Sequence, residues 1–164
     1  MIAELEQRII YKKSLAGGKI SVQNGNTLLF KRRQYEKLAR AIGEELGIPA
    51  ETTEVPLNED VDILFLGSSV YAYGVDDHVK VFINDIHVNI GIVYNFSTAA
   101  LIKSSYPQVN KLLLDKQICL ATEEYACKGE FGPLHRGKPD ARNLKEARKF
   151  ARKMVNKYVN EHQI

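Results

Sequence analysis

The hydrophobic positions along the chain follow helical spacing in some segments and strand spacing in others, and the two alternate from residue 33 onward. The pattern predicts helices near 33–46, 76–86, 100–115 and 141–160, and strands near 51–55, 61–67, 89–96 and 117–121. The run Ile63 to Leu66 is wholly apolar, which is typical of a strand covered by helices on both faces of a parallel sheet. We therefore expect an α/β fold with a doubly wound, five-stranded parallel sheet, because an eight-stranded barrel needs roughly 250 residues.

The first and last predicted helices show clear inward faces. Helix 33–46 carries Tyr35, Leu38, Ile42 and Leu46 on one face and stops at Gly47. The last helix has an apolar stripe made of Leu144, Ala147, Ala151, Met154, Val155 and Tyr158. Its opposite face is cationic, with Arg142, Lys145, Arg148, Lys149, Arg152, Lys153 and Lys157. A solvated outer face explains these charges better than a polyanion site, because no groove-reading motif accompanies them.

Residues 1–32 fit the pattern less well. Three segments could be the first strand: 8–13, 19–23 and 27–30. Asn24-Gly25 lies between two of them and is a strong signal for a tight hairpin turn. The sequence thus leaves open an extra N-terminal hairpin at the sheet edge.

Length, composition and charge predict a single cytoplasmic domain spanning residues 1–164. The chain has 164 residues, 45% of them hydrophobic, and its net charge is a mild +3. No apolar run approaches the roughly 20 residues of a membrane span, and residues 1–8 lack the features of a signal peptide. Cys119 and Cys127 have no metal-binding or disulfide pattern, so we expect both to be reduced. The four histidines share no metal-ligand spacing, and no metal site is expected.

Small and hydroxyl-bearing residues follow two of the predicted strands. Ligands in parallel sheets bind just beyond the carboxyl ends of strands, which places a candidate site at Ser68 to Gly74. A plain strand-to-helix connection is the alternative for that segment. Ser97 and Thr98 occupy the corresponding place after the next strand, where they could contact a ligand or cap the helix expected from residue 100.

These segments resemble the flavodoxin-like family over about residues 33–160. The blocks that carry the resemblance are 66–74, 96–100, 127–131, 137–140 and 147–151. The resemblance implies a flavodoxin-like three-layer sandwich that binds flavin mononucleotide (FMN) without a covalent bond. The implied FMN contacts are Asn24, Gly25, Asn26, Thr27, Ser68, Ser69, Val70, Tyr71, Ala72, Tyr73, Gly74, Ser97, Thr98, Ala99, Cys127 and Gly129.

The two ends of the implied flavin site differ in how well the sequence matches the family. At the ring end, Ser68, Ser69, Ala72 and Gly74 are small enough for close backbone approach, and Tyr71 or Tyr73 could stack on the flavin. At the phosphate end, Asn24 to Thr27 resembles half of a phosphate loop, but the next helix starts several residues later than the family pattern requires. Either the helix begins early or a hairpin replaces the phosphate loop.

The sequence therefore predicts an FMN-binding protein that transfers electrons to an unidentified redox partner protein or small acceptor. The flavin would carry the redox chemistry, so no catalytic residue is assigned. The alternatives are a flavin-free interaction or scaffold module, whose hairpin could pair with a second subunit in a homodimer, and a small reductase using a nicotinamide donor. Neither a nucleic acid nor a membrane is an expected partner.

Overall fold

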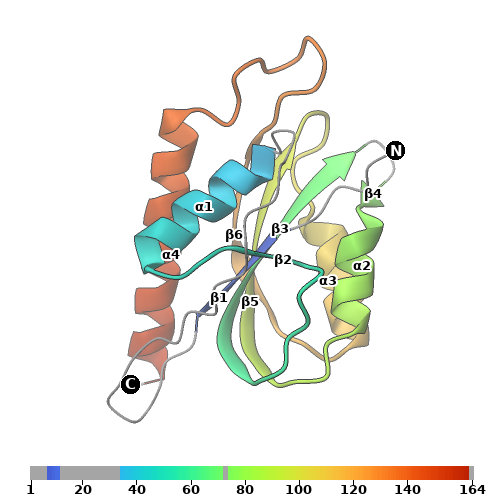
Figure 1. Cartoon of the computed structure of the whole chain (residues 1–164), viewed down its shortest axis with the longest axis vertical. Helices are drawn as coiled ribbons and strands as arrows, with labels where there is room; N and C mark the ends of the chain where they lie inside the picture. Colours follow the sequence, from blue (N-terminus) through green and yellow to red (C-terminus); the bar gives the residue numbers. More distant parts are fainter. Residues whose placement is uncertain (1–6, 12–33, 72–73, 163–164) are drawn as a thin grey trace.

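The structure is a computed structural model and describes residues 7–11, 34–71 and 74–162. Within these ranges the chain forms a mixed α/β fold (Figure 1). The helices are α1 (Gln34–Leu46), α2 (Asp77–Asn84), α3 (Tyr106–Asp115) and α4 (Ala141–Glu161). The strands are β1 (Gln7–Tyr11), β2 (Glu51–Thr52), β3 (Val61–Tyr71), β4 (Gly74–Val75), β5 (Ile90–Ala99) and β6 (Leu120–Lys128). Among the described residues, no helix is both long enough and apolar enough to cross a membrane.

The sheet has the strand order β2-β1-β3-β5-β6, and the short β4 pairs with β3. Strands β3, β5 and β6 are parallel, as predicted. The prediction of a sheet with five parallel strands is wrong, because β1 runs antiparallel to β3 and β2 runs antiparallel to β1. The first of the three candidate segments for the initial strand, residues 8–13, overlaps β1. The predicted turn at Asn24-Gly25 lies outside the described residues.

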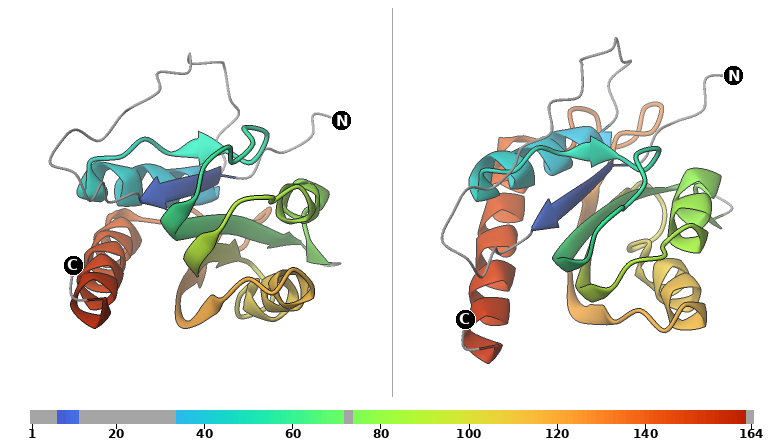
Figure 2. Two further views of the ribbon diagram at one scale, coloured as in Figure 1. Left: turned by 90° about the horizontal axis from the view of Figure 1, so that it is seen from below. Right: turned by 60° about the horizontal axis from the view of Figure 1, so that its bottom comes forward.

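Helices lie on both faces of the sheet, with α1 and α4 on one face and α2 and α3 on the other (Figure 2). Phe65 and Tyr94 on the first face stack with their ring centroids 5.5 Å apart. Leu64 and Leu66 point to the second face and pack with the side chains of α2 and α3. Both faces of β3 are thus buried, which explains its continuous apolar sequence.

The predicted inward face of α4 is confirmed, and so is that of α1 for the side chains that the structure describes, which exclude Tyr35. Leu38 and Ile42 of α1 are fully buried. In α4 the buried residues are Ala147, Ala151, Met154, Val155 and Tyr158, and Leu144 packs against them. A capping box at Asp140 and Asn143 starts α4, and Gly47, with φ of 68°, follows the end of α1.

The middle of the chain departs from the predicted boundaries. Strands β3 and β5 continue to residues 71 and 99, several residues beyond the prediction, and β6 occupies 120–128 rather than 117–121. Helix α3 begins at Tyr106, six residues after the predicted start at residue 100, with Pro107 in its first turn. These shifts change the surroundings of the predicted site residues.

Candidate functional site

The carboxyl ends of the three parallel strands meet at one edge of the sheet. Val70 of β3 is the register partner of Ala99 of β5, and Ala99 is the partner of Lys128 of β6. The carboxyl ends of these three strands therefore lie next to one another, as the sequence predicts. Figure 1 shows this edge at the top of the molecule, the end at which α1 also begins. We call it the carboxyl edge.

Several predicted site residues lie within the strands and are buried there. Ser68 and Ser97 are register partners with no exposed surface, and Thr98 and Ala99 are only 4% and 3% exposed. The expectation that Ser97 or Thr98 caps the following helix is wrong, because Ser105 is the residue before α3. Their side chains are thus part of the buried interior beneath the carboxyl edge and are not exposed on its surface.

A network of polar side chains lies beneath the carboxyl edge and joins β5, β6 and the connection to α3. Asn95 Nδ2 donates a hydrogen bond to Glu124 Oε2 at 3.0 Å, and Ser105 Oγ donates to Asn95 Oδ1 at 3.1 Å. Ser104 Oγ donates to Glu124 Oε1 at 2.9 Å. The backbone N–H of Ser105 reaches Ser97 Oγ at 3.4 Å. These contacts fix the segment that follows β5, and sequence reasoning missed them.

The segments after β5 and β6 carry exposed apolar side chains that sequence reasoning also missed. Leu101 and Ile102 follow β5, while Phe131 and Leu134 follow β6, and all four are 41–67% exposed. We call these four side chains the apolar rim. His135 Nε2 lies 3.2 Å from the carbonyl oxygen of Ala100 and joins the two segments. The signal in the sequence was the Gly132-Pro133 turn between two apolar residues, which pairs Phe131 with Leu134.

The remaining predicted contacts fall into two groups. Asn24 to Thr27, Ala72 and Tyr73 lie outside the described residues, and nothing is described of the side chains of Ser69 and Tyr71. Gly74 adopts φ of 128°, a conformation that strongly favours glycine, and it pairs with Tyr71 in the short ladder between β3 and β4. Gly129 is buried, and its N–H donates to the Ala99 carbonyl oxygen at 3.2 Å, which extends the pairing of β5 and β6.

Cys127 and Cys119 are both free cysteines in the structure. Cys127 is the register partner of Thr98 and packs against the core under α4. Burial raises the pKa of the Cys127 thiol to about 11. Because the thiolate is the reactive form, this thiol stays protonated and is a packing group at neutral pH.

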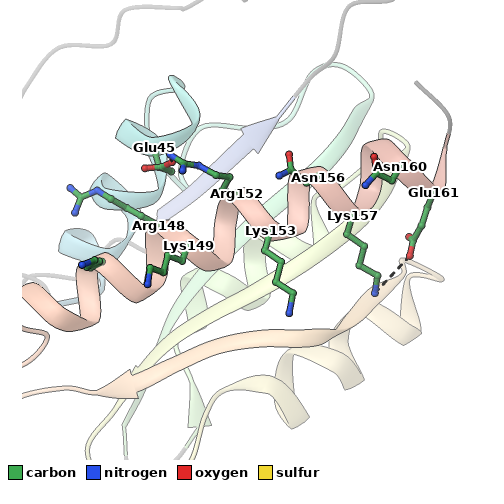
Figure 3. Close-up of a pocket in the computed structure, with 10 residues that line it drawn as sticks. Glu45, Arg148, Lys149, Arg152, Lys153, Asn156, Lys157, Asn160 and Glu161 are labelled. Carbon is green, nitrogen blue, oxygen red and sulfur yellow. Dashed lines mark ion pairs between the residues drawn. The ribbon is translucent and has the colours of Figure 1, made fainter.

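A groove of about 850 Å³ lies on a different part of the molecule, along α4 (Figure 3). Every residue that lines it belongs to α4 except Glu45 of α1. Its lining is mainly cationic and contains no residue of the carboxyl edge. The groove and the carboxyl edge are therefore two separate surfaces.

Comparison of the chain with protein-family models, with curated proteins and with solved structures finds no match. The class of protein is accordingly defined by the structure alone, as a mixed α/β protein with three parallel strands and helices on both faces of its sheet.

Proposed function

We propose that the carboxyl edge binds FMN and that the protein transfers electrons through it as a flavodoxin-like carrier. The observation that carries the proposal is the apolar rim at the joined ends of β5 and β6. Exposed apolar groups that cluster on a surface mark binding sites, and parallel sheets bind their ligands at this edge. The spatial order of the strands, β2-β1-β3-β5-β6, corresponds to the order 2-1-3-4-5 of flavodoxin-like sheets, and the antiparallel direction of β1 departs from that all-parallel arrangement.

The residues of the rim fit a flat, largely apolar ring. Leu101, Ile102 and Phe131 offer side chains that would contact an isoalloxazine ring, and His135 holds their two segments together. The sequence resemblance adds residues 69–74 as the third wall. Lys128 at the end of β6 is exposed and brings a positive charge to this edge, which favours the more negative, reduced form of a bound flavin. When bound, FMN would supply the electron-accepting and electron-donating chemistry.

One observation favours the second candidate, a flavin-free interaction module. Tyr11 at the end of β1 pairs with Ile63 near the start of β3, so the chain leaves β1 at the end of the sheet opposite to the carboxyl edge. In a flavodoxin-like protein the phosphate loop follows the first strand directly at the carboxyl edge. Without a phosphate loop at the carboxyl edge, the apolar rim would serve a protein partner instead.

Absorption spectroscopy separates the two candidates. The purified protein is mixed with excess FMN, passed through a gel-filtration column and scanned between 300 and 550 nm, with riboflavin as a matched ligand that lacks the phosphate. Retained bands near 370 and 450 nm, roughly the positions expected of an oxidised flavin, support FMN binding. Retention of both ligands with similar affinity would support a ring site without a phosphate loop. A folded protein that retains neither ligand would overturn the FMN proposal and leave the interaction module.

A further inference from the structure

The outer face of α4 carries two rows of cationic side chains that differ in their partners. Arg148 and Arg152 turn towards α1, where Arg148 Nη2 lies 2.6 Å from Glu44 Oε2 and Arg152 pairs with Glu45 (Figure 3). The second row consists of Lys145, Lys149, Lys153 and Lys157, and Figure 3 shows the side chains of Lys153 and Lys157 pointing away from α1. The positive charges of this first row, Arg148 and Arg152, are thus neutralised by carboxylates of α1.

The second row is mostly unneutralised. Lys157 pairs with Glu123 and Glu161. Among the described residues, Lys145, Lys149 and Lys153 make no ion pair or hydrogen bond, and all three are exposed. We call these three residues the lysine row. They are spaced four residues apart, so their charges repeat about every 6 Å along the helix.

The lining of the groove argues against two kinds of anionic partner. It contains no aromatic side chain on which a base could stack, as single-stranded nucleic acids require. It also contains none of the exposed large apolar side chains, so α4 lacks the residues that insert into a membrane surface. Asn156 and Asn160 continue the groove beyond the lysine row and can donate hydrogen bonds to carboxylates.

We propose that the lysine row and the groove beside it dock an acidic helix of a partner protein. A helix with glutamate or aspartate at every fourth position presents carboxylates about 6 Å apart, the same repeat as the lysine row. Such a helix lying along α4 would place each carboxylate opposite one lysine, and Asn156 and Asn160 would bind its polar side chains. The inference does not depend on flavin binding, because the groove shares no residue with the carboxyl edge.

Fluorescence anisotropy with a labelled peptide tests this inference on the full-length protein. The probe is an alanine-based helical peptide of about 20 residues with glutamate at every fourth position, and the control probe has glutamine at the same positions. The variant Lys149→Gln with Lys153→Gln removes the centre of the lysine row. Its matched control is Lys37→Gln with Lys111→Gln, which changes the net charge equally at two exposed lysines on α1 and α3. Circular dichroism checks that both variants fold.

We expect the glutamate peptide to bind at about 50 mM salt and to be released as salt screens the charges. The K149Q/K153Q variant should bind it roughly fivefold more weakly, in line with the loss of two exposed ion pairs, and the K37Q/K111Q variant should bind it nearly as the original protein does. Equal binding of the glutamine peptide, equal weakening in both variants, or no binding would overturn the inference. Tighter binding of a uridine oligonucleotide or of phosphatidylserine vesicles than of the glutamate peptide would also overturn it, in favour of a nucleic acid or a membrane.

Discussion

Asn95 of β5 accepts a hydrogen bond from the hydroxyl of Ser105, 3.1 Å away, across the connection between β5 and α3. Both residues are fully buried. Asn95 also donates to Glu124 of β6, so one side chain ties two strands and a loop together. A buried polar group is costly unless it is hydrogen-bonded, and each member of this network depends on the others.

Two buried serines allow this dependence to be measured. Ser105→Ala leaves the Oδ1 atom of Asn95 without its donor, and we expect the free energy of unfolding to fall by about 1–3 kcal/mol. Ser68 is equally buried, but its hydroxyl has no hydrogen-bond partner among the described residues. Ser68→Ala should therefore be neutral or slightly stabilising. Urea unfolding compares the two variants, and equal losses of stability would contradict the assigned network.

The same network explains why the sequence predicted the strands better than their ends. Ser68, Ser97 and Thr98 were interpreted as loop residues because small hydroxyl side chains are typical of turns. They lie inside β3 and β5 instead, where Ser97 Oγ accepts a hydrogen bond from the backbone N–H of Ser105, a contact that a local sequence pattern does not show. Glu124 has a similar effect on the prediction of β6, because acidic residues are uncommon in strands. The hydrogen bond from Asn95 of β5 that Glu124 accepts cannot be seen in the local sequence.

The helices were predicted more accurately because their signals are local. The apolar stripe of α4 and the stop signal at Gly47 each lie within one segment of sequence, and both are confirmed. The start of α3 was misplaced because Ala100 to Ile102 looked like the first turn of a helix, whereas these residues form part of the exposed connection. The contacts between that connection and the segment after β6 join residues 35 positions apart, beyond the reach of a local pattern.

The apolar rim gives the FMN proposal a direct mutational test. Leu101→Asp combined with Phe131→Asp places two charges where the flavin ring would lie, and we expect FMN affinity to fall at least about tenfold. The matched control is Val81→Asp with Leu114→Asp, because these side chains are similarly exposed but belong to α2 and α3. Since all four side chains are exposed, both variants should fold. Titration of FMN fluorescence measures the affinity, and an equal effect of the two variants would place the flavin elsewhere.

Cys127 predicts how stability changes at alkaline pH. The pKa of its thiol is raised by burial from 9.0 to about 11, so the folded state favours the neutral thiol. This contribution is fully present below about pH 9 and is lost progressively as the pH rises through about 11. Between pH 8 and 10 the original protein should therefore lose more unfolding free energy than a Cys127→Ala variant. Urea unfolding at the two pH values measures both losses, and the same loss in the two proteins would contradict a partly buried, neutral thiol at Cys127.

Gly43 and Gly47 of the α1 terminus should resist replacement for different reasons. A Cβ atom at Gly43 would lie 2.6 Å from the carbonyl oxygen of Ile48, where the chain turns back on the helix. Gly43→Ala should therefore reduce the unfolding free energy by about 1–3 kcal/mol, although alanine is the better helix former by about 1 kcal/mol. At Gly47 a Cβ meets no atom within 4 Å, but φ of 68° is unfavourable for alanine.

Asparagine distinguishes these two causes, because it tolerates the left-handed conformation better than alanine but is larger. Gly47→Asn should be more stable than Gly47→Ala, whereas Gly43→Asn should be no more stable than Gly43→Ala. Thermal unfolding of the four variants provides the comparison. If asparagine rescued both positions equally, the close approach of Gly43 to Ile48 would not be the cause of its loss, and the turn after α1 would have to pack differently from the one described.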